Sequence, residues 1–252
     1  MLTFERQDII LSILKQQKVA KLAELTQATG ASESTIRRDL SELERKQKLK
    51  RIHGGASLPS RKSDEPDMTE KKVSYTEEKR RIGQLAAKLV EDGDSIYIDA
   101  GTTTEAIISH IQAKNVTIVT NGLNIIETAI HYGFRTYVIG GYVKTGTHAF
   151  VGKTAQEAMR QYRFDKAFIG TNGIDQEFGY STPDPEEAYI KQLAIEEAQQ
   201  AYVLADASKL DRTSFTRFAS LEEADLITEA SEETAEYLEQ LSEYTSIEAV
   251  KT

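Results

Sequence analysis

Apolar residues recur at helical spacing in three short segments at the start of the chain. The first covers residues 4–16 and the second residues 21–29, with a break at residues 18–20 between them. Gly30 and Ala31 then form a tight turn before the third segment, which begins at Ser32. Three short helices with a tight turn before the third predict a helix-turn-helix DNA-binding domain.

The third of these helices has one apolar and one basic face. At about 100° per residue, Ile36, Leu40 and Leu43 cluster on one side, while the opposite side carries hydroxyls and guanidinium groups. Arginine can bond bidentately to guanine edges, and Ser or Thr can bond to bases or phosphates. An ordinary amphipathic helix with a solvated basic face would show the same pattern. The expected DNA contacts are Ser32, Ser34, Thr35, Arg37 and Arg38.

A strand with a glycine turn follows this helix. Residues 49–53 alternate apolar and polar positions and stop at Gly54-Gly55. Such a wing would carry Arg51 and His53 to phosphates or into a minor groove, with Gly54 at its tip. His53 is equally compatible with a plain surface residue. The first part of the chain is therefore predicted to be a winged helix-turn-helix domain.

After residue 75 the pattern alternates between strands and helices. Predicted strands cover residues 95–99, 116–120, 136–139, 166–170, 201–205 and 226–228; predicted helices cover residues 75–90, 103–111, 123–132, 154–162, 185–199 and 232–241. This alternation predicts an α/β fold with a doubly wound, mainly parallel sheet. Ligands of such sheets bind beyond the carboxyl ends of the strands.

Polar residues stand at several of those strand ends. Backbone N–H groups, a helix dipole and threonine hydroxyls between a strand and a helix suit a phosphate. A helix start that uses threonines for its own N–H groups would look the same, and glycines after strands are often only turns. The residues expected to converge on one edge are Asp99, Gly101, Thr102, Thr103, Thr104, Thr120, Asn121, Gly140 and Gly141.

Four charged residues complete this candidate site. Lys209 follows the strand at 201–205 and can supply a cation to the same phosphate, with Asp206 placed to orient it or to bond sugar hydroxyls. A surface ion pair at a strand end is the competing interpretation. Glu187 and Lys191, one helical turn apart, either close over the ligand or form a solvated pair.

Charge divides the chain into two parts with different expected partners. Residues 1–62 hold 13 Lys and Arg against 7 Asp and Glu, a balance of +6, within a chain of net charge −9. The remainder holds 18 against 33, a balance of −15. A basic module joined to an acidic one is expected of a regulator with separate DNA and effector domains.

Composition narrows the remaining possibilities. There is no cysteine, and the four histidines show no ligand spacing, so we expect no metal and no cofactor. No apolar run approaches membrane-spanning length and the first residues do not resemble a signal peptide, so we expect a cytoplasmic protein without a membrane partner. Residues 58–72 are rich in Ser, Pro, Lys, Asp and Glu. We therefore expect a DNA-binding domain at 1–57, a linker at 58–74 and a sensor domain at 75–252.

The sequence also resembles a known family. Ser-Thr-Ile-Arg-Arg-Asp-Leu at 34–40, followed by Arg-Ile-His-Gly-Gly-Ala at 51–56, is similar to the amino-terminal signature of the DeoR family of bacterial transcription regulators. The similarity continues through residues 99–104, 120–121, 140–141 and 206–209. It implies a sensor domain resembling ribose 5-phosphate isomerase, in which Asp99, the Gly-Thr-Thr-Thr loop and Lys209 hold a phosphorylated sugar.

Residues 171–174, 182–187 and 202–206 resemble the fructose operon repressors of this family. That resemblance implies repression of fructose genes, relieved by fructose 1-phosphate. Ala207 departs from the pattern, because many relatives have a polar residue there. A lactose-type repressor that senses tagatose 6-phosphate is therefore the alternative of the same kind.

A sugar-phosphate isomerase is the alternative from another class, since Asp99, Asp175, Asp206 and Lys209 offer acid–base groups. A metabolic isomerase has no use for a DNA-binding domain, and sharing the fold of an enzyme does not by itself confer catalytic activity. We therefore expect no enzyme. Two DNA-binding domains of an oligomer bind the two half-sites of an operator. We therefore expect a homo-oligomer, a dimer or a tetramer, bound to operator DNA.

Overall fold

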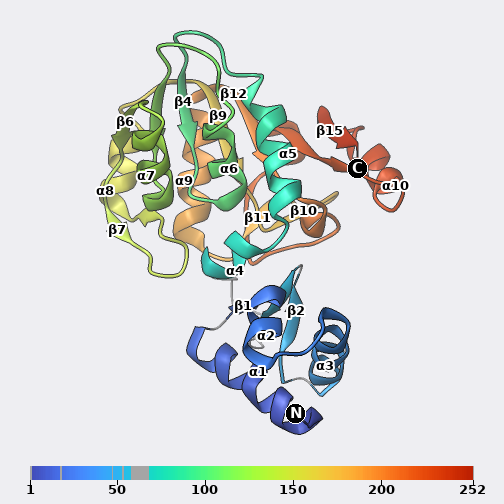
Figure 1. Ribbon diagram of the computed structural model, residues 1–252. Coiled ribbons are helices and arrows are strands. Elements are labelled where there is room, and N and C mark those ends of the chain that lie inside the picture. Colours follow the sequence, from blue (N-terminus) through green and yellow to red (C-terminus); the bar gives the residue numbers. More distant parts are fainter. Residues whose placement is uncertain (1, 18, 47, 53, 58–67, 252) are drawn as a thin grey trace. The chain divides into compact units, whose positions relative to one another are not determined.

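The computed structural model describes residues 2–17, 19–46, 48–52, 54–57 and 68–251, and the chain falls into two compact units (Figure 1). The first unit is Met1–Thr76 and the second is Glu77–Thr252. Each has its own hydrophobic core.

The first unit is a winged helix-turn-helix domain, as the sequence predicts. Its helices are α1 (Thr3–Gln17), α2 (Leu22–Thr29), α3 (Glu33–Arg45) and α4 (Met68–Val73). Its antiparallel sheet has the order β1 (Val19–Lys21), β3 (Gly55–Ser57), β2 (Lys50–Ile52). Ile10, Leu25 and Ile36, all fully buried, belong to the core that joins α1, α2 and α3. Burial of each such side chain contributes roughly 1.5–3 kcal/mol to the free energy of folding.

Two local differences from the sequence prediction occur in this unit. The break expected at residues 18–20 holds strand β1, which exists because Val19, Ala20 and Lys21 pair across to β3. The two helices are separated there as expected, but three residues are too few for an alternating pattern to be recognised, so the strand was not predicted. Helix α4 also falls within the segment expected to be a linker.

Two glycines shape the turn and the wing. Gly30 ends α2 with a φ of 65° and donates its N–H to the Thr26 carbonyl at 2.8 Å, a left-handed end that favours glycine. A Cβ on Gly55 would lie 2.1 Å from the carbonyl oxygen of Ala20. Only glycine therefore lets β3 approach β1 this closely.

The second unit is built on a seven-stranded sheet in which every neighbouring pair is parallel. Across the sheet the order is β15 (Ile247–Lys251), β14 (Asp225–Ala230), β12 (Ala198–Leu204), β9 (Phe164–Gly170), β4 (Ser95–Ile98), β5 (Thr117–Thr120) and β6 (Arg135–Val138). The expected α/β class with a doubly wound, parallel sheet is confirmed.

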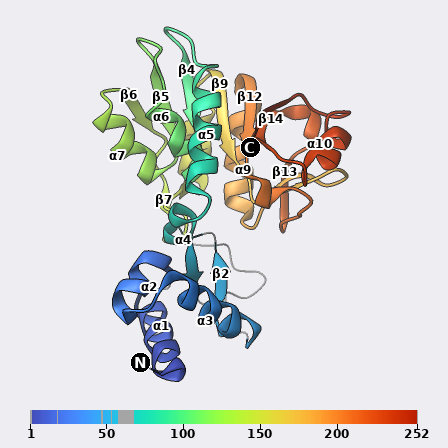
Figure 2. The ribbon, with the colours of Figure 1, turned by 45° about the vertical axis from the view of Figure 1, so that its right-hand side comes forward.

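Helices cover both faces of this sheet (Figures 1 and 2). One core cluster joins the sheet to α5 (Thr76–Ala87), α6 (Thr102–Ile108) and α7 (Leu123–His131). The other joins it to α8 (Lys153–Met159), α9 (Pro185–Glu196) and α10 (Ala235–Leu241). Helix α9 is shorter than expected, because residues 198 and 199 already belong to β12.

Several short elements were not predicted. Strands β10 (Gly173–Asp175), β11 (Gly179–Thr182) and β13 (Thr216–Ala219) form a second, antiparallel sheet, and β7 (Tyr142–Val143) pairs with β8 (Phe150–Val151). Short 3-10 turns, η1 (Ala207–Lys209) and η2 (Leu221–Glu223), follow β12 and β13. Within the described ranges, no helix has both the length and the apolar character needed to cross a bilayer.

Candidate functional site

Helix α3 presents a polar, basic face. Ser32 caps its start, accepting the N–H of Thr35 at 3.3 Å, and the hydroxyls of Ser34 and Thr35 lie 3.0 and 2.9 Å from the Ser32 hydroxyl. Arg37 and Arg38 are exposed one turn later. Arg37 lies 3.7 Å from Glu33, whereas the Arg38 guanidinium has no ion pair or hydrogen bond with any described residue. The hydroxyls and guanidiniums expected to contact DNA therefore share one exposed surface.

The opposite face of α3 is fixed by an ion pair that the sequence analysis did not single out. Asp39 is buried and pairs with Arg6 of α1 through both carboxylate oxygens, one of them 3.1 Å from an Arg6 Nη. Next to it, Gln7 donates to Glu42 at 3.2 Å. These contacts join residues more than 30 positions apart, so helical periodicity alone could not reveal them.

The wing is tied to the same helix. Arg51 donates through a guanidinium nitrogen to the Ser41 hydroxyl at 2.7 Å, and its backbone N–H donates to Glu44 at 2.7 Å. Gly54 is exposed with a φ of 84° at the tip. His53 lies outside the described residues. Arg51 therefore lies beside α3 and extends its basic surface.

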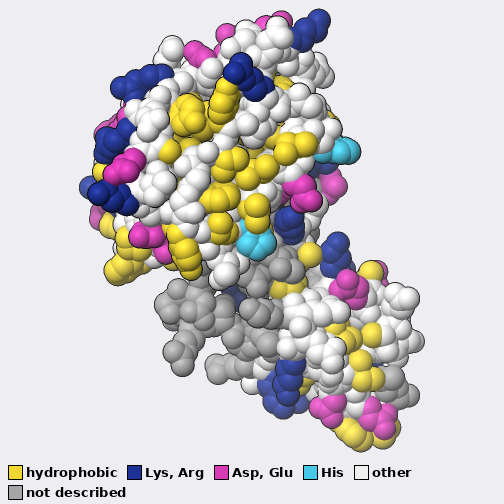
Figure 3. Space-filling model, turned by 90° about the vertical axis from the view of Figure 1, so that its left-hand side faces the viewer, with side chains coloured by type: hydrophobic (Ala, Val, Ile, Leu, Met, Phe, Trp, Pro, Cys, Tyr) yellow, Lys and Arg dark blue, Asp and Glu magenta, His cyan; other side chains and the backbone are white. Residues whose placement is uncertain are grey.

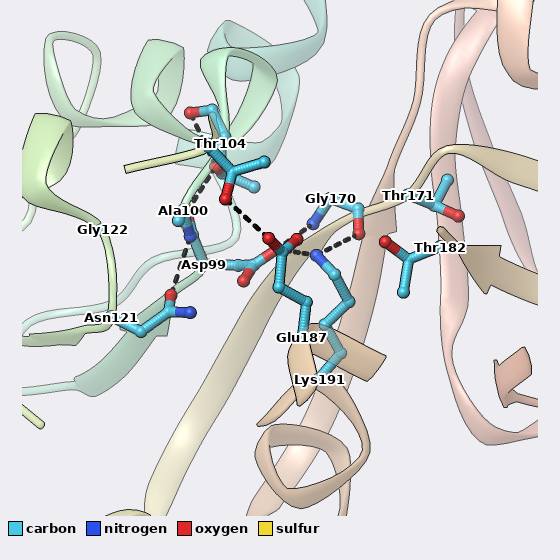
Figure 4. A network of polar contacts seen from close by, with 12 residues as sticks. Asp99, Ala100, Thr104, Asn121, Gly122, Gly170, Thr171, Thr182, Glu187 and Lys191 are labelled. Atoms are coloured by element: carbon cyan, nitrogen blue, oxygen red, sulfur yellow. Dashed lines mark hydrogen bonds and ion pairs between the residues drawn. The ribbon is translucent and has the colours of Figure 1, made fainter. Parts of the chain in front are cut away.

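A buried ion pair lies at the carboxyl edge of the parallel sheet (Figure 4). Asp99 directly follows β4, and its carboxylate pairs with the Lys191 ammonium of α9. The same carboxylate accepts the Gly170 N–H at 3.0 Å, and Lys191 donates to the Gly170 carbonyl at 2.9 Å. Asp99 and Lys191 are 1% and 4% exposed, so both charges are held away from water.

Glu187 lies one turn before Lys191 and is also buried. Its carboxylate accepts from the Thr147 hydroxyl at 2.6 Å and lies 2.7 Å from the Lys144 ammonium, which is 2.9 Å from Asp184. The interpretation of Glu187 and Lys191 as a solvated surface pair was therefore wrong. Lys144 and Thr147, from the β7–β8 hairpin, were missed because nothing in their local sequence marks a contact 40 residues away.

Burial and these partners shift the acids in opposite directions. Burial raises the pKa of Asp99, the Glu187 charge adds to the rise, and Lys191 with the Gly170 N–H opposes it. For Glu187 burial also acts upward, but Lys191, Lys144 and Thr147 together hold its pKa below the ordinary value. Tyr97, fully buried on β4, has a raised pKa from burial and from both carboxylates.

Three of the expected polar residues form hydrogen bonds to backbone groups at this edge of the sheet. The Thr104 hydroxyl donates to the carbonyls of Asp99 at 2.7 Å and Gly101 at 3.1 Å, and the side chain is fully buried. Thr120, also fully buried, donates to the Ile98 carbonyl at 2.6 Å, and Asn121 accepts the Ala100 N–H at 2.9 Å (Figure 4). These side chains shape the edge of the sheet.

Gly101, Thr102 and Thr103 begin α6 and are only half-buried. Gly140 and Gly141 follow β6 with φ values of 70° and 111°. The backbone of Gly141 packs so closely on Val151 that a Cβ would lie 2.5 Å from the Val151 carbonyl oxygen. Gly141 therefore has a packing role, whatever else this loop does.

Asp206 and Lys209 occupy another part of the same edge. Asp206 directly precedes η1 and Lys209 is its last residue, and η1 packs against β14. The Asp206 carboxylate caps η1 by accepting the Ser208 N–H at 3.0 Å. Glu229 of β14 accepts the Ala207 N–H at 3.4 Å and pairs with Arg81 of α5 at 3.5 Å. One strand, β9, lies between β12, which leads to Asp206, and β4, which leads to Asp99.

Metal ligation finds no support in the described part of the chain. Among the residues that the structure describes, no three His, Asp or Glu side chains are grouped so that they could hold a metal ion. The arrangement that the structure does show is an edge of backbone N–H groups, hydroxyls and paired charges, which suits a polar, anionic small molecule.

Two family models match the chain. The DeoR-like helix-turn-helix domain matches residues 6–62, and the DeoR C terminal sensor domain matches residues 74–230.

Individual proteins show the same similarity. The uncharacterized HTH-type transcriptional regulator FruR of Bacillus subtilis (strain 168) is 49% identical over 92% of this chain and 93% of its own. A lactose phosphotransferase system repressor of Staphylococcus epidermidis is 35% identical over 89% of this chain and 90% of its own. Among solved structures, ribose 5-phosphate isomerase A of Methanocaldococcus jannaschii is 19% identical with a TM-score of 0.41, covering 54% of this chain and 55% of the other.

Proposed function

The chain belongs to the DeoR family of helix-turn-helix transcription regulators, and on that premise we propose that it represses a sugar-utilisation operon until a phosphorylated sugar releases it. The observation that carries the proposal is the pairing, in one chain, of an exposed Ser-, Thr- and Arg-bearing helix with a polar edge of a parallel sheet.

Operator DNA would be read by α3 and its wing. Ser32, Ser34, Thr35, Arg37 and Arg38 contact bases and phosphates, and Arg51 with the residues of the wing tip contacts the backbone or the minor groove. The buried Arg6–Asp39 pair supports this role, because it holds α3 in one orientation on α1.

The sugar phosphate would bind across the carboxyl edge of the sheet. The half-buried start of α6, Gly101–Thr103, offers backbone N–H groups and hydroxyls to the phosphate, and Lys209 supplies a cation from the loop after β12, beyond β9 on the same edge. The sugar hydroxyls would bond to Asp99, Glu187 and Lys191, which supply two acceptors and one donor within a single buried network. Thr104, Thr120, Asn121, Gly140 and Gly141 would hold these loops in shape.

Fructose 1-phosphate is the sugar we propose. The support is the 49% identity with a regulator named FruR, over nearly all of both chains. The 35% identity with a lactose phosphotransferase system repressor keeps tagatose 6-phosphate as the second candidate. The two ligands differ in where the phosphate stands relative to the ring, so one panel of sugar phosphates separates them.

Release would follow from a shift between two assemblies. The sugar phosphate binds more tightly to one of these assemblies. In that assembly the two DNA-binding domains no longer match the spacing of the two operator half-sites. A ligand shifts such an equilibrium only by its difference in affinity for the two states. The regulator is therefore proposed to act as a homo-oligomer.

Catalysis is not part of this proposal. Of the carboxylates available to an isomerase, Asp175 accepts the N–H groups of Glu177 and Phe178 at 3.0 and 2.7 Å, and Asp206 caps η1. Both serve local turns. Turnover of ketose or aldose phosphates by the pure protein at ordinary enzyme rates would overturn this part.

The test is a thermal-shift screen of the full chain with fructose 1-phosphate, tagatose 6-phosphate, fructose and inorganic phosphate. A ligand at 100 times its Kd stabilises the native state by about 2.7 kcal/mol. We expect fructose 1-phosphate to raise the unfolding temperature most, Lys209→Ala to abolish the rise and Arg38→Ala to preserve it. Arg38→Ala should lose specific operator binding instead. An unchanged response in Lys209→Ala would contradict this placement of the effector.

A further inference from the structure

One side of the second unit exposes far more apolar surface than the rest. Eleven large hydrophobic residues are exposed in the described part of the chain, and six of them lie between residues 123 and 142. These six, which we call the β6-edge patch, are Leu123, Ile130, Tyr132, Tyr137, Val138 and Tyr142. They come from α7, β6, β7 and the turn that joins α7 to β6.

The patch surrounds an open edge of the sheet. β6 pairs with β5 on one side, and no described strand pairs with its other side. Figure 3 faces this side of the unit and shows hydrophobic side chains gathered over its middle, with Lys, Arg, Asp and Glu around them. Unpaired sheet edges with apolar side chains promote association unless something covers them.

The size of the patch fits an interface. A fully exposed aromatic side chain presents about 150–250 Å². With exposed fractions from 37% to 67%, the six residues together present on the order of 600 Å². That is the upper end of what a monomer usually exposes in one patch, roughly 300–600 Å², and near the roughly 800 Å² that each partner buries in a standard interface.

Charge and composition favour a second copy of this chain as the occupant. Glu127 on α7 and Arg135 at the start of β6 are both exposed at the patch, so it carries both signs. In a two-fold interface each copy contributes the same surface, and a patch with both signs can pair with itself where a patch of one sign would repel itself. Three of the six residues are tyrosines, which are enriched at interface cores.

From these observations we infer that the β6-edge patch is the self-association surface of the second unit, where two copies pack in an isologous dimer. The inference assigns a surface to the homo-oligomer proposed above and rests on that part of the proposed function. It is independent of the proposed operator and effector contacts: a monomeric wild type would contradict both proposals, whereas patch variants that still assemble would contradict the assigned surface alone.

Sedimentation velocity of the full chain tests it. The wild type should sediment as a dimer or a higher even assembly, and Ile130→Arg should raise the dissociation constant at least about 30-fold, as expected for a charge placed in the centre of an interface. Phe215→Arg is the matched control, because Phe215 is 81% exposed in the same unit but far along the chain from the patch. It should sediment like the wild type.

Ile130 is 65% exposed, so its replacement should leave the unfolding midpoint of the monomer unchanged. Tyr142→Ser, on the β7–β8 hairpin, provides an independent variant that should also weaken association. A wild type that is monomeric at every concentration, or variants at both positions that assemble like Phe215→Arg, would overturn the inference.

Discussion

At the scale of single residues, the candidate sensor site depends on charges that are buried and paired. Asp99, Glu187 and Lys191 could be named from the sequence because Asp99 stands at a predicted strand end, and Glu187 and Lys191 lie one turn apart on a predicted helix. The partners of these three side chains could not be named from the sequence. The Lys191–Asp99 pair spans 92 positions and the Thr147–Glu187 bond spans 40, so both exist only after the sheet has formed.

The Lys191–Asp99 pair should be costly to break from one side. Lys191→Met leaves the Asp99 carboxylate buried without its cation, and we expect a loss of about 3–5 kcal/mol in the free energy of unfolding. Lys153→Met removes an exposed pair with Glu157 and should cost less than about 0.5 kcal/mol. Urea denaturation compares the two. Equal, small losses in both variants would mean that the Asp99 charge is not buried in solution.

Lys144 should link the stability of the second unit to pH. The depressed pKa values of Glu187 and Asp184 contribute stability that is present above their unfolded values, about 4, and lost as the pH falls through the lower folded values. Lys144→Met should therefore cost about 2 kcal/mol at pH 7, as expected for hydrogen bonds to charged groups, and progressively less below pH 4. Unfolding free energies measured from pH 7 to 3 give this difference. A penalty that does not change with pH would exclude the proposed ion cluster.

At the scale of elements, the prediction succeeded where apolar runs were long. The parallel strands and the helices between them are buried on a repeating pattern, so β4, β5, β9 and β12 and the helices α6, α7 and α9 were all expected. Very short strands were missed. β1 has three residues, and β7 and β8 have two each, and they are defined by a partner elsewhere in the chain.

The wing illustrates how much one such pairing matters. Gly55→Ala places a Cβ against the Ala20 carbonyl, so β3 must move away from β1 at a cost of about 1–3 kcal/mol. We expect weaker operator binding, measured by fluorescence anisotropy, with an unchanged thermal response to the sugar phosphate.

Gly146→Ala is the control for this variant, because nothing lies within 4 Å of its added Cβ. It should change neither measurement. If Gly55→Ala also bound operator like the wild type, the wing would not contribute to DNA binding.

At the scale of the whole molecule, the two units divide the work by charge. The basic balance of residues 1–62 favours DNA phosphates, while the acidic remainder resists them, in keeping with our proposal that α3 and the wing bind the operator. The sequence predicted this division, but not the buried networks within each unit. The central claim is that a sugar phosphate bound in the second unit lowers the affinity of the first unit for operator DNA.

The most direct test is an anisotropy titration of the full chain on a DNA duplex that the wild type itself selects from a random library, with and without each sugar phosphate. We predict that saturating fructose 1-phosphate weakens operator binding at least tenfold, about 1.4 kcal/mol, while fructose and inorganic phosphate leave it unchanged. An operator affinity that stays the same with every sugar phosphate would contradict the account.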